Sequence, residues 1–196
     1  MKRAMTFATV LLMAVAITVS VIAAQTSDAD KKTEETAEKV PAPDVDEQIA
    51  GLEAMCAANS EARSARHKET PLFERLGGEE GIHALTREIV RLHLENEAID
   101  YMFKDLDADK VAHRVALFVI SGTGGPAVYD GPELKVSHAD MGLTNADFLT
   151  AGGDVIQAMK NLGYKQDEID EVVCILVSLR GQVVLAEEGE KEAGGY

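Results

Sequence analysis

The sequence predicts an all-α protein with one folded domain between residues 71 and 186. Apolar residues in this region recur every three or four positions, as they do on one face of a helix, and no segment alternates as a half-buried strand would. Glycine pairs at 77–78 and 124–125 interrupt the pattern where helices are expected to end. The 196 residues leave room for a single compact domain once the segments on either side are set apart.

The chain opens with two basic residues, Lys2 and Arg3, and residues 5–24 then contain no charge. A basic start, an apolar run and the small pair Ala23-Ala24 are typical of a secretory signal peptide. The run is also long enough, at about 20 residues, to cross a bilayer if it stays attached. We therefore expect residues 1–24 to be a signal peptide or an N-terminal membrane anchor. Both predict an exported, periplasmic or otherwise extracytoplasmic domain, soluble or associated with the membrane through residues 5–24.

Residues 25–70 are predicted to form an acidic linker. Asp, Glu, Lys, Thr and Ala dominate, and Pro41 and Pro43 interrupt any helix. Few large apolar side chains are present, so ordering this segment would cost conformational entropy that burial does not recover. Part of the linker, from Val45 to Arg66, has helical spacing. It is expected to form either a short amphipathic helix, free or packed on the domain, or a partly helical linker. Its spaced residues are Ile49, Leu52, Met55 and Cys56.

The formal net charge is −15 and the sequence pI is near 4.7. Such an acidic chain repels phosphate backbones, so its composition argues against nucleic acid as a partner. The charge is better suited to keeping the protein soluble.

Two cysteines occur in unlike settings. Cys174 lies on an apolar helical face and is expected to be a small buried hydrophobe. Cys56 lies in the linker, where we expect it to be exposed. An oxidising compartment would permit a disulfide between the two or an intermolecular bond through Cys56, and the sequence leaves both open.

The domain begins with a short helix over residues 71–76, which ends at Gly77-Gly78 because glycine permits a sharp reversal. A second helix is predicted over 80–95, with apolar residues on one stripe. Asp107 is a suitable N-cap for a third helix that continues to Ile120. The apolar residues of this third helix recur on a single face and are Val111, Val115 and Phe118.

A turn-rich segment and a short helical run then present His138. Thr144 with Asp147 resembles a capping box and starts a helix to about Leu162. Gly152-Gly153 inside that helix would let another backbone or a cofactor approach closely. The last helix is predicted over 167–185, and residues 187–196 form a polar tail expected to fray.

His138 can be an axial ligand of iron, because a neutral imidazole nitrogen is a good donor to that metal. A lone histidine is more often structural, so the surrounding motifs decide the interpretation. They are, in order, Leu72-Phe73-Glu74-Arg75-Leu76-Gly77-Gly78, Phe103, Phe118, Gly124-Gly125-Pro126, Tyr129, Gly131 and His138-Ala139-Asp140-Met141-Gly142-Leu143. This ordered set resembles the group I truncated haemoglobins, and the resemblance covers about Pro71 to Val184.

The resemblance implies a two-over-two helical sandwich with haem between a distal and a proximal helix. His138 would be the proximal iron ligand, and Phe103 would pack flat against the porphyrin. Arg114 falls where the family often has a basic residue that reaches a haem propionate, although a solvent-facing arginine is the alternative. Residues at positions that line the apolar pocket in the family are Phe118, Leu134, Leu143 and Phe148. The chain has no C-x-x-C-H motif, so the implied cofactor is non-covalent haem b.

The chain departs from the family on the distal side. Val90 stands where a tyrosine is usual, Val115 where many members have glutamine, and Val111 at the gate one turn earlier. These side chains cannot donate a hydrogen bond to bound dioxygen, which argues against efficient oxygen storage. Carbon monoxide and nitric oxide depend less on such bonds. His93 is the only histidine expected to reach the pocket as a donor or sixth ligand, with a core or surface histidine as the alternative.

The sequence thus predicts an exported haem protein that binds dioxygen, nitric oxide or carbon monoxide and acts as a sensor, carrier or scavenger. An unidentified reductant would keep its iron ferrous. Gas binding is favoured over a dedicated enzymatic role, because no acid or base stands at the expected distal positions. The alternatives are a haem-based redox enzyme, with nitric oxide dioxygenase or weak peroxidase activity, and a haem-free globin-like interaction domain.

Overall fold

The computed structural model describes residues 44–185, and this part of the chain is helical without any strand. The predicted all-α class is confirmed. The helices are α1 (Val45–Ala58), α2 (Ser60–Glu69), α3 (Leu72–Arg75), α4 (Gly78–Glu95), η1 (Asp100–Met102), α5 (Ala108–Gly122), α6 (Leu134–His138), α7 (Asn145–Asn161) and α8 (Gln166–Val183). The predictions for residues 1–24, for the linker up to residue 43 and for the tail 187–196 lie outside the described residues.

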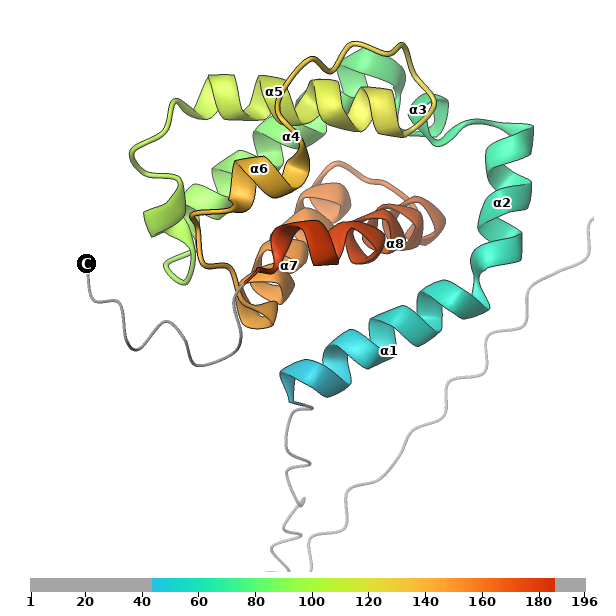
Figure 1. The fold of residues 1–196 in the computed structure, drawn as a ribbon. Helices are drawn as coiled ribbons and strands as arrows, with labels where there is room; N and C mark the ends of the chain where they lie inside the picture. Colours follow the sequence, from blue (N-terminus) through green and yellow to red (C-terminus); the bar gives the residue numbers. More distant parts are fainter. Residues whose placement is uncertain (1–43, 186–196) are drawn as a thin grey trace, which may run out of the picture. The chain divides into compact units, whose positions relative to one another are not determined.

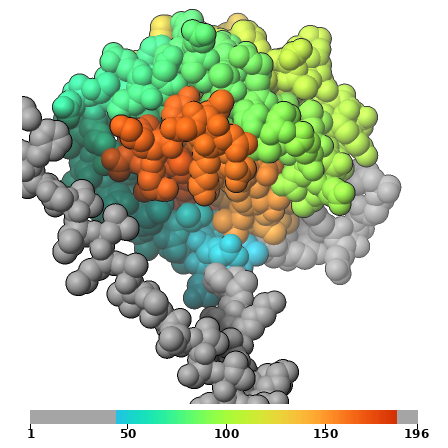
Figure 2. Space-filling view, turned by 180° about the vertical axis from the view of Figure 1, so that it is seen from behind, coloured from blue at the N-terminus to red at the C-terminus, as the bar shows by residue number. Residues whose placement is uncertain are grey.

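Two helix pairs build the domain (Figure 1). α4 packs along α5, α7 packs on α8, and α4 joins the two pairs through its contacts with α7. In Figure 2 the orange surface of α7 and the start of α8 lies beside the green surface of α4. Burial of apolar side chains between the pairs is the main stabilising term of such a fold. The core consists of Leu72, Leu76, Ile82, Leu85, Ala116, Ile120, Val155, Ala158, Met159, Ile169 and Val173.

Helix starts follow the local signals in the sequence. The Asp107 carboxylate accepts a hydrogen bond from the Lys110 N–H at 3.1 Å, as expected of an N-cap. At the start of α7, the Thr144 N–H donates to Asp147 at 2.9 Å and the Asp147 N–H donates to the Thr144 hydroxyl at 3.4 Å. This is a complete capping box.

The turn between α3 and α4 requires glycine. Gly77 has a φ of 86°, a left-handed conformation that other residues rarely adopt. A side chain at Gly81 would collide with the carbonyl of Leu76. That same carbonyl accepts a hydrogen bond from the Tyr164 hydroxyl at 2.8 Å, so the turn is also fixed to the loop between α7 and α8.

The second half of the predicted linker is helical and belongs to the folded unit. Residues 45–69 form α1 and α2, and α1 packs against α7 and α8. Ile49 is buried in this contact, and the Arg180 guanidinium reaches Glu53 at 3.1 Å. The amphipathic helix expected here therefore packs on the domain.

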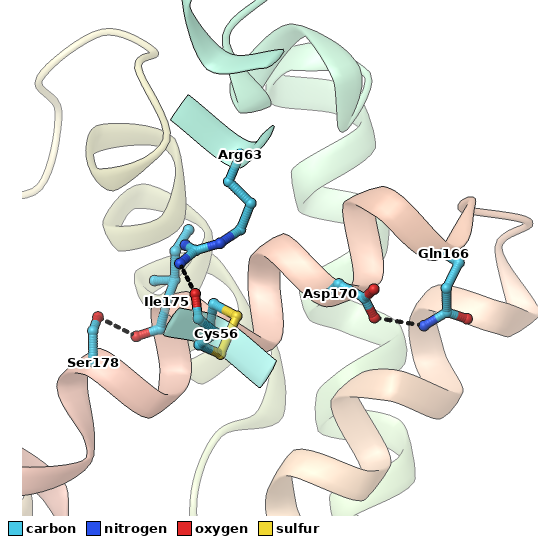
Figure 3. Close-up of a disulfide and its surroundings, with 7 residues drawn as sticks. Cys56, Arg63, Gln166, Asp170, Ile175 and Ser178 are labelled. Atoms are coloured by element: carbon cyan, nitrogen blue, oxygen red, sulfur yellow. Dashed lines mark hydrogen bonds between the residues drawn. A yellow bond between two sulfur atoms is a disulfide. The ribbon is translucent and has the colours of Figure 1, made fainter. Parts of the chain in front are cut away.

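A disulfide joins α1 to α8 between Cys56 and Cys174, whose Cα atoms are 5.4 Å apart (Figure 3). Cys56 is only 8 % exposed, so the expectation that it would be exposed is wrong. Its backbone carbonyl accepts a hydrogen bond from the Arg63 guanidinium of α2 at 2.8 Å. The disulfide and this bond fix the corner between α1 and α2 next to α8.

A buried carboxylate links the first helices to the last one. Glu171 accepts a hydrogen bond from the Arg75 guanidinium at 2.6 Å, and Arg75 also reaches Glu168 at 3.1 Å. Arg66 of α2 lies 3.9 Å from the same Glu171 oxygen. Removing Arg75 would leave the buried Glu171 carboxylate with only the longer contact to Arg66, which is costly in a buried position.

Among the helices between residues 44 and 185, none combines the length and the apolar character needed to cross a membrane.

Candidate functional site

His138 is the last residue of α6, and its ring orientation is set within this short helix. Its Nδ1 lies 2.7 Å from the backbone carbonyl oxygen of Leu134. A carbonyl can only accept, so Nδ1 carries the proton and Nε2 keeps a free electron pair. Histidines that bind metals usually donate the second ring N–H in this way, which fixes the tautomer. The imidazole is partly exposed and therefore suited to ligate a metal through Nε2.

The segment after His138 is fixed to the C-terminal end of α8. The His138 carbonyl accepts from the Met141 N–H at 3.2 Å, and Gly142 then turns the chain with a φ of 57°. Leu143 is buried, and its carbonyl accepts from the Leu185 N–H at 3.3 Å. α6 also packs on α8. The position of His138 thus depends on contacts with the end of the domain.

α5 presents two apolar faces of different character. Ala112, Ala116 and Ile120 form its buried face, and small residues here permit the close packing of α5 on α4. The face predicted from the sequence is less buried than this one. Val111 and Phe118 are partly exposed and Val115 is 37 % exposed. A helix that packs on an apolar cofactor has apolar side chains that other protein atoms do not cover, and these three residues meet that condition.

Arg114 and Leu134, two further residues predicted to contact haem, are also accessible. Arg114 lies beside Val115 and is exposed. The Phe118 ring meets the Tyr129 ring edge-on, with centroids 5.3 Å apart. The Tyr129 hydroxyl donates to the carbonyl of Pro132 at 2.7 Å, so it stabilises the loop that leads to α6. Leu134, at the start of α6, is partly exposed.

Val90, the residue expected on the distal side, is apolar and buried on α4. Val90 is only 5 % exposed. One turn earlier, the buried hydroxyl of Thr86 donates to the carbonyl of His83 at 3.3 Å. Sequence reasoning did not single out Thr86, because a threonine in a helix often bonds to its own backbone in this manner.

His93 is a buried core histidine held by α7. Its Nδ1 lies 2.8 Å from Oδ2 of Asp154, and its ring stacks on Phe103 with centroids 4.8 Å apart. Burial lowers the pKa of His93 below its usual value of 6.5, and Asp154 opposes this shift only in part. The imidazole is therefore neutral at neutral pH and donates its Nδ1–H to the carboxylate. Of the two interpretations of His93, the structure favours the core histidine.

The remaining histidines lie elsewhere on the surface. His113 is exposed and its ring stacks against that of His83, with centroids 5.4 Å apart and ring planes 8° from parallel. His67 is exposed on α2, and its Nδ1 lies 3.5 Å from the Leu72 amide nitrogen. Neither of these two contacts involves His138.

Phe148 lies on α7 and faces α1 and α8. It lines an apolar cavity of about 370 Å³ formed by these three helices. The other lining residues are Gln48, Gly51, Leu52, Leu149, Gly152, Gly153, Ile156, Val173, Leu176 and Val177. None of the other nine predicted haem contacts belongs to this wall, so the role of Phe148 at the haem stays a prediction from the resemblance.

The fold and the site together define a class of helical protein. Two packed helix pairs, a short helix ending in a histidine with one ring nitrogen already bonded, and an uncovered apolar face on α5 are features of a globin that binds haem between its distal and proximal helices. The chain's own residues fit the cofactor, because a neutral imidazole that donates its Nδ1–H can offer Nε2 to iron, and Val111, Val115 and Phe118 leave apolar surface accessible on α5.

Comparison with known proteins agrees with this class. Residues 71–184 match the family described as bacterial-like globin, and the chain belongs to this family. The group 1 truncated hemoglobin of Tetrahymena thermophila is 26% identical over 113 residues, which cover 58% of this chain and 93% of that protein. Globins of this family bind diatomic gases at haem.

Solved structures show the same relationship. The truncated hemoglobin of Tetrahymena pyriformis in its Fe(III) form is 25% identical, with a TM-score of 0.55, and the match covers 60% of this chain and 99% of that one. The 2/2 hemoglobin of Synechococcus in the cyanomet state, with covalently attached heme, is 26% identical with a TM-score of 0.55, covering 59% and 98% of the two chains. The predicted two-over-two globin fold is confirmed.

Proposed function

We propose that this protein is an exported haem protein that binds a diatomic gas at an iron ligated by His138. The observation that carries the proposal is the hydrogen bond from His138 Nδ1 to the Leu134 carbonyl at 2.7 Å. It leaves Nε2 as the coordinating atom within the segment that matches the globin family. The Fe(III) and cyanomet relatives support haem iron as the metal.

The cofactor of the proposal is non-covalent haem b. The sequence lacks the C-x-x-C-H motif, and both cysteines are joined to each other in the disulfide, so neither is free to form a thioether. Bound haem would supply an iron with one open coordination position for the gas. The protein would contribute the fifth ligand and an apolar environment that excludes water.

Each predicted residue has a role in this proposal. His138 holds the iron through Nε2, and Phe103 packs against the porphyrin. Arg114, exposed on α5, would pair with a propionate. The apolar wall would consist of Val111, Val115, Phe118, Leu134 and Leu143. The resemblance adds Phe148, which in the structure lines the cavity between α1, α7 and α8.

The side chains proposed for the distal side set the preference among gases, because none of them can donate a hydrogen bond to the bound gas. Val90, Val111 and Val115 have no donor, and the nearby Thr86 hydroxyl is bonded to the His83 carbonyl. A polarised iron-bound dioxygen would forgo a hydrogen bond worth about 1–3 kcal/mol in a dry pocket. We infer that carbon monoxide and nitric oxide are retained better than dioxygen, relative to globins with a distal tyrosine and glutamine.

The proposal also includes export of the protein and reduction of its haem iron. The basic start and the uncharged run of residues 5–24 support secretion or anchoring outside the cytoplasm. A disulfide between Cys56 and Cys174 fits such an oxidising compartment. A reductant in that compartment would keep the iron ferrous for gas binding.

The test is the absorbance of the purified full-length protein after loading with limiting haem. His138→Ala should abolish or greatly weaken the Soret band, because the proximal ligand is removed. His113→Ala is the matched control, since His113 is an exposed histidine on α5 and should leave the band unchanged. A wild-type spectrum in His138→Ala would show that the ligand is wrongly assigned. A wild-type protein that takes up no haem would favour the interaction domain instead.

A further inference from the structure

A partly buried cluster lies where α4 meets α7, and it consists of the polar residues Asp154, His93 and Asn96 and the aromatic residue Phe103. Asp154 is the only member on α7, and its carboxylate is the centre of the cluster. His93 Nδ1 is 2.8 Å from Oδ2, and the Asn96 side-chain amide is 3.0 Å from each carboxylate oxygen. The side chains of His93 and Asp154 are 9 % and 16 % exposed. Hydrogen bonds to an ionised group in such a setting are among the stronger ones in proteins.

Asn96 also shapes the backbone that leads to Phe103. Its side-chain oxygen accepts from the Ala98 N–H at 3.2 Å, and its backbone carbonyl accepts from the N–H groups of Ile99 and Asp100 at 2.9 and 2.8 Å. The Asp100 carbonyl then accepts from the Phe103 N–H at 2.8 Å. A continuous chain of hydrogen bonds therefore runs from the Asp154 carboxylate to the backbone of Phe103.

A second connection between Asp154 and Phe103 runs through the aromatic ring of His93. The His93 imidazole stacks on the Phe103 phenyl ring with centroids 4.8 Å apart and an angle of 28° between the planes. The bond to Asp154 fixes the imidazole, because a carboxylate accepts the Nδ1–H in one orientation of the ring. Phe103 remains partly exposed, so part of its ring surface is not covered by the imidazole.

We propose that Asp154 is a positioning residue for the haem pocket, and that it sets the Phe103 ring through His93 on one side and Asn96 on the other. This inference rests on the proposed function, in which Phe103 packs against the porphyrin. Asp154 itself would not touch the cofactor. The carboxylate of α7 thereby controls the corner between α4 and α5, and with it how firmly the haem is held.

The test compares four variants of the full-length protein. Asp154→Ala removes the acceptor for both connections, and His93→Leu removes the stacked ring while keeping an apolar side chain. Asp154→Asn keeps an acceptor oxygen and should restore most of the wild-type behaviour. The control is Glu171→Ala, which removes another buried carboxylate, one that is bonded to Arg75 of α3.

Two measurements separate positioning from general destabilisation. The first is hydrogen exchange at the amides of residues 99–103, which needs no haem signal. Exchange there should accelerate in Asp154→Ala and stay at the wild-type rate in Glu171→Ala. The second is the rate at which haem passes to an excess of a haem-free acceptor protein. Haem loss should be about tenfold faster in Asp154→Ala and in His93→Leu, which corresponds to about 1.4 kcal/mol in free energy. In Asp154→Asn the rate of haem loss should be close to that of the wild type.

Wild-type haem loss in both Asp154→Ala and His93→Leu would overturn the inference, as would an equal acceleration in Glu171→Ala. If Asp154→Ala does not fold, His93→Leu alone decides the haem measurement. The proposed function fails separately, when His138→Ala keeps the wild-type Soret band. In that case faster exchange at residues 99–103 would leave Asp154 as the residue that orders this corner, without a role at haem.

Discussion

At the scale of single residues, the proposed distal side of the haem pocket carries valines that cannot donate a hydrogen bond. Val90 is buried on α4, and Val115 is partly exposed on α5. Neither can donate a hydrogen bond, and the structure shows His93 bonded to Asp154. The gas preference of the proposed site therefore depends on side chains that restrict the space around the bound gas and form no hydrogen bond with it.

Restoring one hydroxyl should change dioxygen release. Val90→Tyr is expected to slow dioxygen dissociation by about tenfold, since a hydrogen bond worth about 1.4 kcal/mol changes a rate or affinity by that factor. Stopped-flow measurement of dioxygen release checks this. Val90→Phe is the matched control, because it adds the same ring without the hydroxyl and reports the effect of overpacking a site that is 5 % exposed. Equal dissociation rates for the tyrosine and phenylalanine variants would contradict the apolar-pocket account.

His93 should make the stability of the protein sensitive to acid. Burial lowers its pKa in the folded state below 6.5, while the unfolded chain binds a proton near that value. The unfolded state therefore gains protons first as the pH falls, and the stabilisation present above pH 6.5 is progressively lost below it. The loss is at most about 1.4 kcal/mol per pH unit for one proton.

Urea unfolding of the wild type and of His93→Gln, on both sides of pH 6.5, measures this effect. The free energy of unfolding should fall less steeply with acid in the variant, because glutamine does not titrate. Identical pH slopes for the two proteins would show that His93 does not change its protonation on unfolding.

At the scale of helices, α1 lies outside the segment that matches the globin family, yet it is fixed to that segment. Its contacts with α7 and α8 include the buried Ile49 and the ion pair between Glu53 and Arg180. The disulfide joins residues that are 118 positions apart, so it closes a long loop in the unfolded chain. Most of the attachment of α1 should depend on this bond.

Removing the disulfide by changing Cys56 and Cys174 to serine should lower the free energy of unfolding by about 2–5 kcal/mol. Chemical denaturation measures the loss. Hydrogen exchange should locate it, with faster exchange in α1 and unchanged protection in α4 and α5, because few buried side chains hold α1 otherwise. Slow exchange throughout α1 in the double variant would show that packing alone keeps it in place.

At the scale of the whole molecule, we propose that the N-terminal segment directs the globin domain out of the cytoplasm. Its uncharged run follows two basic residues, and the disulfide of the domain fits an oxidising space. Fractionation of a tagged full-length chain should place the protein outside the cytoplasm, in the periplasmic or membrane fraction. Replacing two apolar residues of the run with lysine should retain it inside the cell. A wild-type chain that remains soluble in the cytoplasm would refute the export proposal.

The sequence alone was enough for the features that depend on neighbouring residues. The caps at Asp107 and Thr144 and the left-handed Gly77 each act within one helical turn. Their residue types are therefore enough to predict them from the sequence. The ordered motifs around His138 gave the globin fold before any packing was known. The hydrogen bond from His138 to Leu134 is also local, since the two residues are four positions apart in one helix.

Only the tertiary structure decided which distant residues meet. Cys56 pairs with Cys174 across 118 positions, and His93 bonds to Asp154 across 61. Helical periodicity placed His93 on the inner face of α4. The sequence does not show whether a residue on that face meets the proposed haem pocket or α7, because no neighbouring residue differs between the two cases. The choice depends on which helices pack against which, a consequence of burying all apolar faces at once.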